Sequence, residues 1–170
     1  KLDAELGLTQ IAESSALEAV IIRPPLVYGP GVQANFLELM RLVHKQYPLP
    51  LGSVNNKRSF VGIDNLVSLI ITCIDHPAAP NHVFLVSDNA DLSTPDLIRH
   101  IAHAQGRHAR LFPFPQQLLH LGAKLLHREL QYMRLCGTLQ LDISKTMDLL
   151  GCNPFASPEL ILAQTLEYAG

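Results

Sequence analysis

Short apolar runs alternate along this sequence with longer segments of helical periodicity, and this alternation constrains the fold more than any other feature. Residues 19–22 form a β-branched run that stops at Arg23-Pro24-Pro25. Residues 35–43 place apolar side chains at the i, i+3, i+4 and i+7 positions of one helix face. A strand that is buried on both faces has such a continuous apolar run. The alternation therefore predicts an α/β fold.

The same patterns predict the individual elements. We expect short strands at 19–22, 83–86 and 139–141. We expect helices at 2–14, 35–43, 116–127 and 144–150. Capping residues predict three more helices: one capped by Asp64 or Asn65 that runs to about 75, one from Ser93 to Gly106, and a last one from Ser157. The three expected strands are about half the number in a complete doubly wound domain.

Composition excludes several classes of function. The 170 residues are 48% hydrophobic and 16% charged, so they can form a core. Lys plus Arg number 13 against 15 Asp plus Glu, a net charge of −2 that excludes a dedicated nucleic-acid binder. No apolar run reaches the length of a membrane span, so we expect no membrane partner, and no secretion signal is visible.

The three cysteines, Cys73, Cys136 and Cys152, lie too far apart for a disulfide framework or a metal motif. We interpret them as reduced thiols of a cytoplasmic protein and expect no metal site. The ten glycines never form a phosphate-binding G-x-G-x-x-G or P-loop pattern. The first residue is Lys, which suggests a processed or trimmed chain, or part of a longer one.

Four motifs in a fixed order resemble the second half of the extended short-chain dehydrogenase/reductases, the nucleotide-sugar epimerase and dehydratase family. They are Arg23-Pro24-Pro25-Leu26-Val27-Tyr28-Gly29-Pro30, the Asn35-Phe36 pair with the later Leu-Pro-Leu-Gly turn, Arg58-x-Phe60-Val61-x-x-Asp64, and Asp142-x-Ser144-Lys145 followed by Leu149-Leu150-Gly151. The resemblance implies the C-terminal part of a Rossmann-type doubly wound fold plus a smaller α/β substrate-binding domain. Residues 1–30 would end the NAD-binding domain, and residues 31–170 would form the substrate domain, with segments that return to the Rossmann sheet.

The resemblance also implies a cofactor, NAD or NADP, bound mainly by an N-terminal half that this sequence lacks. Lys1 matches the lysine of the family's Tyr-x-x-x-Lys motif, which makes it the candidate catalytic and cofactor-binding residue. An ammonium group near a phenol lowers the pKa of the phenol and can donate to ribose hydroxyls. Pro24, Pro25 and Val27 match positions beside the nicotinamide.

Substrate-binding positions of the family fall on seven residues: Leu26, Asn35, Phe36, Leu49, Leu51, Arg58 and Arg134. Arg58 is the strongest of them, because a guanidinium group can bind a diphosphate through two hydrogen bonds. Asn35 can equally be a helix cap, and the two leucines at 49 and 51 can equally be core residues. Leu26 departs from the asparagine common in sugar epimerases, because leucine cannot donate a hydrogen bond to a pyrophosphate.

We therefore expect part of an NAD-dependent nucleotide-sugar epimerase, dehydratase or reductase that acts through a keto-sugar intermediate on a UDP-sugar or UDP-N-acetyl sugar, as in polysaccharide synthesis. Without the glycine-rich loop and the tyrosine, this chain should not turn over substrate by itself. The family also implies a homodimer formed through the helix at 2–14. The alternatives are a non-catalytic nucleotide-sensing or protein-binding module, and a hydroxysteroid-type dehydrogenase.

Overall fold

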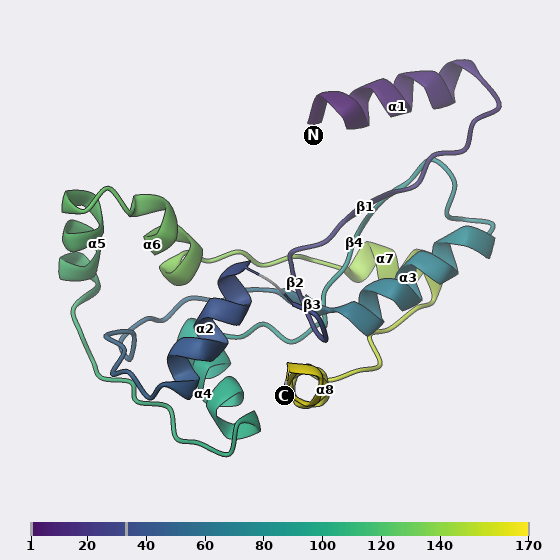
Figure 1. Cartoon of the computed structure of the whole chain (residues 1–170). Coiled ribbons are helices and arrows are strands. Elements are labelled where there is room, and N and C mark those ends of the chain that lie inside the picture. Colours follow the sequence, from purple (N-terminus) through teal and green to yellow (C-terminus); the bar gives the residue numbers. More distant parts are fainter. Residues whose placement is uncertain (1, 33, 170) are drawn as a thin grey trace.

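The structure, a computed structural model, describes residues 2–32 and 34–169, without the side chains of residues 34, 35 and 169. Helices and short strands alternate, which confirms the predicted α/β class (Figure 1). In chain order the elements are α1 (Leu2–Ser14), β1 (Ile21–Arg23), β2 (Leu26–Tyr28), α2 (Ala34–His44), β3 (Phe60–Gly62), α3 (Ile63–Asp75), β4 (Val83–Leu85), α4 (Thr94–Ala104), α5 (Gln116–Leu125), α6 (Glu129–Cys136), α7 (Ser144–Leu150) and α8 (Pro158–Ala169).

The strands form two parallel pairs. β1 pairs with β4, with Ile21 beside Val83, and β2 pairs with β3, with Leu26 beside Phe60. Pro24 and Pro25 separate β1 from β2. Because proline has no backbone N–H, the β1 ladder ends there and the chain passes to the second pair. Helix α2 lies in the connection between the paired strands β2 and β3, as parallel pairing requires. Helix α3 leads from β3 to β4, which belongs to the other strand pair.

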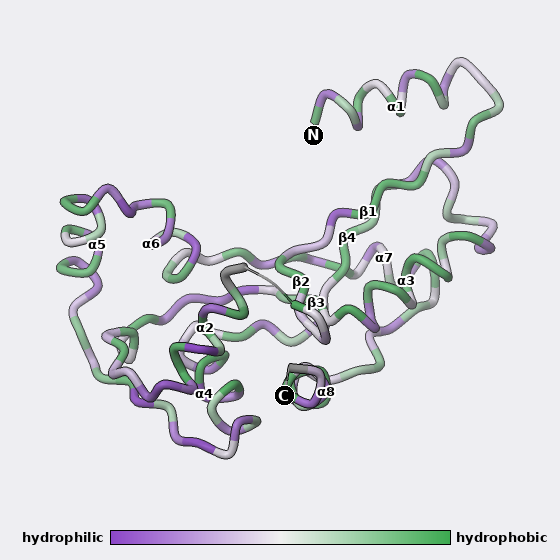
Figure 2. Tube along the Cα trace, in the orientation of Figure 1, coloured by the Kyte–Doolittle hydropathy of each residue, from purple (hydrophilic) through white to green (hydrophobic). Residues whose placement is uncertain are grey.

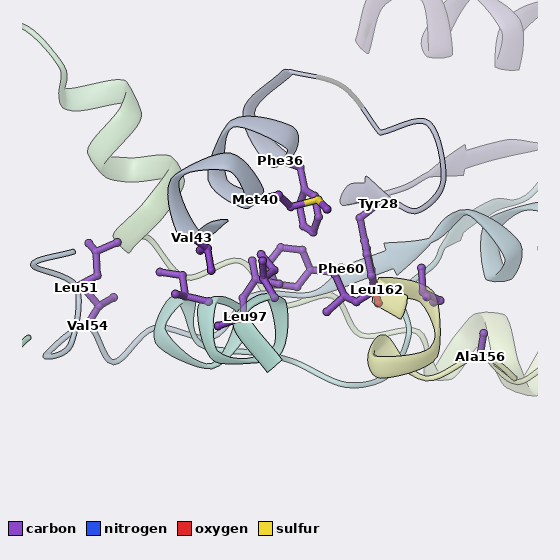
Figure 3. Close-up of a cluster of buried hydrophobic side chains, with 14 residues drawn as sticks. Tyr28, Phe36, Met40, Val43, Leu51, Val54, Phe60, Leu97, Ala156 and Leu162 are labelled. Atoms are coloured by element: carbon purple, nitrogen blue, oxygen red, sulfur yellow. The ribbon is translucent and has the colours of Figure 1, made fainter. Parts of the chain in front are cut away.

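The larger core cluster lies between α2, α4, α8 and the β2–β3 pair. Figure 3 shows Phe36 and Met40 of α2 directed toward Tyr28 and Phe60. The Tyr28 ring stacks on Phe36 with centroids 5.6 Å apart and meets the edge of Phe60 at 6.3 Å. Aromatic pairs at these separations add to the stabilisation from burial. The aromatic contacts fix α2 and its N-terminus against the strand pair.

A second cluster joins β4 to α3 and α7. Phe84 and Val61 are fully buried there, and Leu69, Cys73 and Leu150 close around them. The opposite face of α3 is exposed. The α3 helix thus uses only one of its apolar faces within the described part of the chain.

Two predicted details differ from the structure, and three elements were not predicted. α3 begins after Gly62 without a side-chain cap, so the predicted cap by Asp64 or Asn65 is wrong, because the Asn65 amide has other partners. Residues 139–141 form no strand; Leu139 makes only an isolated bridge to Arg58. The elements that were not predicted are strands β2 and β3 and helix α6. The Ser93 cap is confirmed, since its hydroxyl accepts a hydrogen bond from the Asp96 N–H.

Helices α1, α5 and α6 lie at the periphery, and all their described side chains are exposed or half-buried. α1 stands apart from the other elements (Figure 1) and is tied to the end of β1 by an ion pair between Glu5 and Arg23. Apolar residues recur along α1, α5 and α6 (Figure 2). These helices therefore present apolar side chains on the surface.

Candidate substrate-binding site

Arg58 lies two residues before β3 and reaches toward α6. Its backbone N–H and C=O both bond to Leu92, at 3.0 Å each. Its Nη1 donates to the carbonyl oxygens of Gly137, at 3.0 Å, and Met133, at 3.4 Å. These carbonyls lie at the C-terminal end of α6, where the helix macrodipole is negative and favours a cation. The helix end therefore sets the direction of the guanidinium group.

Asn56 also holds the C-terminal end of α6. Its buried side-chain amide donates to the carbonyl oxygens of Leu135, at 3.1 Å, and Gly137, at 3.0 Å, while its oxygen accepts from the Thr94 N–H at 2.8 Å. A buried amide with its hydrogen bonds made is strongly favoured over one without them. Asn56 thus joins α6 to the start of α4. Sequence reasoning missed this residue, because a single Asn in a polar turn gives no distinctive pattern.

The remaining donors of Arg58 are available to a ligand. Within the described ranges, its Nε and Nη2 have no hydrogen-bond acceptor from the protein. The side chain is half-buried, and this desolvation lowers the pKa of Arg58, although an arginine stays protonated at neutral pH. Arg134 is exposed on the last turn of α6, next to Met133, whose carbonyl Arg58 contacts. The fold therefore brings the two arginine-bearing segments predicted to bind phosphate close together.

A buried polar network lies at the C-terminal ends of β2 and β3. The Tyr28 hydroxyl donates to Asp88 at 2.7 Å, and the other oxygen of Asp88 accepts from the Gly62 N–H, at 2.9 Å, and the Asn65 amide, at 2.7 Å. Burial, and then the Asp88 carboxylate, raise the pKa of Tyr28. Tyr28 is therefore a neutral hydrogen-bond donor at physiological pH. It is not a base.

Asn65 also fixes the loop before α8. Its amide donates to the Ala156 carbonyl at 2.9 Å, and its oxygen accepts from the N–H groups of Phe155 and Ala156, at 3.1 Å each. The side chain thus connects three segments that are far apart in the sequence. Asp88 and Asn65 were missed as site-supporting residues, since each looks like an ordinary polar residue beside an apolar run.

The predicted site residues fall in different environments. Pro24 is exposed, Pro25 and Val27 are half-buried, and Leu26 is 43% exposed beside Phe60. Phe36 and Leu51 are buried in the larger core cluster, and Leu49 packs against it. Their role as substrate contacts stays a prediction. Lys1 and the Asn35 side chain lie outside the described residues.

The described part of the chain holds neither a metal-binding cluster nor a membrane-spanning helix. Among residues 2–32 and 34–169, no group of three His, Cys, Asp or Glu side chains is arranged to hold a metal ion. No helix in these ranges is both long enough and apolar enough to cross a membrane.

The fold and its parallel strand pairs place the protein in a known structural class. UDP-glucuronic acid 4-epimerase from Bacillus cereus, solved with NAD, matches 99% of this chain and 49% of its own length, with a TM-score of 0.74 and 21% identity. UDP-glucose 4-epimerase from Thermotoga maritima, solved with UDP-glucose, matches 99% of this chain and 51% of its own length, with a TM-score of 0.72 and 20% identity. These similarities show an α/β fold shared with about half of each structure.

Sequence comparison gives the family. The model of the NAD dependent epimerase/dehydratase family matches residues 1–87. A UDP-glucose 4-epimerase from Vibrio cholerae is 52% identical over 155 residues, which are 91% of this chain and 47% of that protein. The chain belongs to the NAD dependent epimerase/dehydratase family, and it spans about half the length of the Vibrio cholerae relative.

Proposed function

We propose that this chain supplies the substrate-binding side of an NAD-dependent enzyme that epimerises, dehydrates or reduces a nucleotide sugar. The observation that carries this proposal is Arg58, whose guanidinium group is oriented by the end of α6 while Nε and Nη2 stay available. Nε and one Nη are the pair of donors that binds a phosphate oxygen pair side by side. The relative from Vibrio cholerae and the two structures described above carry UDP-sugar epimerase names, which supports a UDP-sugar as the substrate class.

Leu26 sets a limit on the specificity. Its side chain is exposed on β2, beside the strand that follows Arg58, so it would line the same surface. A leucine there offers an apolar contact and no hydrogen bond. We infer that phosphate recognition depends on Arg58, with Arg134 as a second cation, and that Leu26 shapes the sugar side.

NAD or NADP would bind at the other side of the site, where it would accept and donate the hydride. The exposed Pro24 and half-buried Pro25 end β1, and ligands of parallel sheets bind at such carboxyl ends of strands. These residues offer apolar contact with a flat ring and no phosphate-binding group. We propose that Lys1 acts with a tyrosine from a preceding segment. We propose a domain boundary at residue 30, with β3 and β4 as segments of the second part that return to pair with β2 and β1.

Two further features concern the assembly and the location of the protein. Helix α1 exposes Leu2, Leu6 and Ile11, which supports a homodimer formed through this helix. The three free cysteines are typical of a reducing compartment, which supports a cytoplasmic location.

Binding of UDP to the chain, measured by isothermal titration calorimetry, tests the proposal. Arg58→Ala should weaken UDP binding about tenfold or more, since a charge-assisted hydrogen bond contributes about 1.5–3 kcal/mol. Arg58→Lys should be intermediate, because it keeps the charge and loses the paired donors. The exposed Arg107→Ala is the matched control and should bind UDP like the parent chain. Equal affinity of Arg58→Ala and the parent for UDP, or binding of a hydroxysteroid in place of UDP, would contradict the proposal.

A further inference from the structure

The α5–α6 hairpin, residues 116–136, carries an exposed apolar surface next to the proposed substrate site. It forms the left margin of the molecule in Figure 1, remote from α1. The two helices contact each other, with the rings of His120 and Tyr132 4.9 Å apart. The exposed fractions of its large apolar side chains run from 37% for Leu135 to 73% for Leu125, and the others are Leu118, Leu121, Leu126, Leu130 and Met133.

The exposed leucines of α5 follow one helix face. Leu118, Leu121 and Leu125 are spaced i, i+3 and i+7, while Leu119 packs against the larger core cluster. α5 therefore has one apolar side facing the protein and a second apolar side facing outward. Scattered exposed leucines are ordinary in proteins, but a continuous patch of them marks an interaction surface.

The charge of the hairpin differs from that of the whole chain. Lys124 and Arg128 are exposed on it, against the one acidic residue Glu129, while Arg134 on the last turn of α6 is the residue proposed above to contact the substrate phosphate. The chain as a whole carries a net charge of −2. The exposed apolar face of α3 makes a useful contrast, because α3 holds Asp64 and Asp75 and no Lys or Arg. Only the hairpin combines an apolar patch with flanking positive charge among the peripheral described helices.

We propose that the α5–α6 hairpin is a docking surface for a membrane that contains anionic phospholipids. Helices of ten and eight residues are too short to span a bilayer, but a helix with an apolar face and basic flanks lies at the interface between headgroups and acyl chains. The leucines enter the acyl boundary, and the basic residues face the negative headgroups. This inference revises the expectation of no membrane partner. It does not rest on the proposed function.

A second copy of the chain fits this surface less well. A two-fold dimer brings the same patch of both copies together, so the basic residues of two hairpins would face each other and repel. An anionic membrane complements both the apolar and the charged groups. The choice of occupant therefore follows from the charge of the hairpin.

Tryptophan fluorescence gives a direct test, because the chain contains no tryptophan. Leu121→Trp reports on the hairpin, and Ile71→Trp on α3 is the matched control, with exposed fractions of 53% and 58% at the parent residues. Vesicles of phosphatidylcholine with phosphatidylglycerol are added to each folded chain. Leu121→Trp should shift to shorter wavelength and be quenched by brominated acyl chains, while Ile71→Trp should not change. Equal responses from both variants, or none from Leu121→Trp, would overturn the proposal.

The charge dependence is tested on the otherwise unchanged chain by vesicle sedimentation. Lys124→Glu and Arg128→Glu should each lower the partition coefficient for anionic vesicles at least fivefold, a value that follows from about 1 kcal/mol per basic residue near an anionic surface. Pure phosphatidylcholine vesicles should bind weakly. Equal binding to both kinds of vesicle would contradict the proposal. Loss of a dimer on Leu121→Ser, seen by sedimentation velocity, would show that a second copy covers the hairpin and would also contradict it.

Discussion

Replacing Asn65 by alanine removes the side chain that joins α3, Asp88 and the loop before α8. Four hydrogen bonds disappear, two donated by the amide and two accepted by its oxygen. Asn65 is only 4% exposed, so water cannot replace them freely. With a net value of about 1 kcal/mol for each hydrogen bond, Asn65→Ala should lower the free energy of unfolding by about 4 kcal/mol. That is a large part of the stability of an ordinary domain.

Urea unfolding followed by far-UV circular dichroism measures this loss. Asn65→Asp is the informative second variant, since it keeps an oxygen for the Phe155 and Ala156 N–H groups but places a carboxylate against Asp88. Two carboxylates at hydrogen-bond distance cannot both stay ionised, so one must bind a proton on folding. The folded state of this variant then binds more protons than the unfolded state, and its stability should rise as the pH falls.

Exposed Asn55→Ala is the control and should change the free energy of unfolding by less than about 0.5 kcal/mol. If Asn65→Ala lowers the free energy of unfolding by less than about 1 kcal/mol, the buried network does not hold these segments together. The same conclusion follows if the free energy of unfolding of Asn65→Asp equals that of the parent at neutral pH.

Three further predictions concern single groups. Tyr28→Phe removes the hydrogen bond to Asp88 and should cost about 1–2 kcal/mol of unfolding free energy. Because the folded-state pKa of Tyr28 is raised, the parent should lose its extra unfolding free energy over Tyr28→Phe as the pH rises above about 10. A difference in unfolding free energy that stays constant from neutral pH upward would refute the reasoning. Ser93→Ala removes the α4 cap and should lower the free energy of unfolding by about 1 kcal/mol in the same urea assay; an unchanged midpoint would count against the cap. Burial raises the pKa of the three cysteine thiols, so iodoacetamide should modify them more slowly in the folded chain than in urea, and equal rates would contradict the burial.

The sequence predicted most elements because their signals are local. The apolar spacing of α2, the Ser93 cap of α4 and the run that becomes β4 each depend on neighbouring residues. Helix α6 was missed because its exposed residues give no inward apolar face, and it is held instead by Asn56 and Arg58 from a distant segment.

The site was predicted unevenly for a related reason. Arg58 was identified through motif order, and the structure supplies what the motif does not contain, the carbonyl groups that orient it. Asp88 and Asn65 contact each other across 23 residues of sequence, and a single sequence carries no signal of such a pair. Phe36 and Leu51 were identified through family motifs, but both are buried in the larger core cluster, and their contact with a substrate stays a prediction.

The difference in affinity between UDP and uridine, measured by calorimetry on the parent chain and on Arg58→Ala, tests the proposed function most directly. Only the diphosphate distinguishes the two ligands, so the comparison isolates the group that Arg58 is proposed to bind. The parent should bind UDP at least tenfold more tightly than uridine, and Arg58→Ala should lose most of that preference, with little change for uridine. An undiminished preference for UDP in Arg58→Ala would contradict the account.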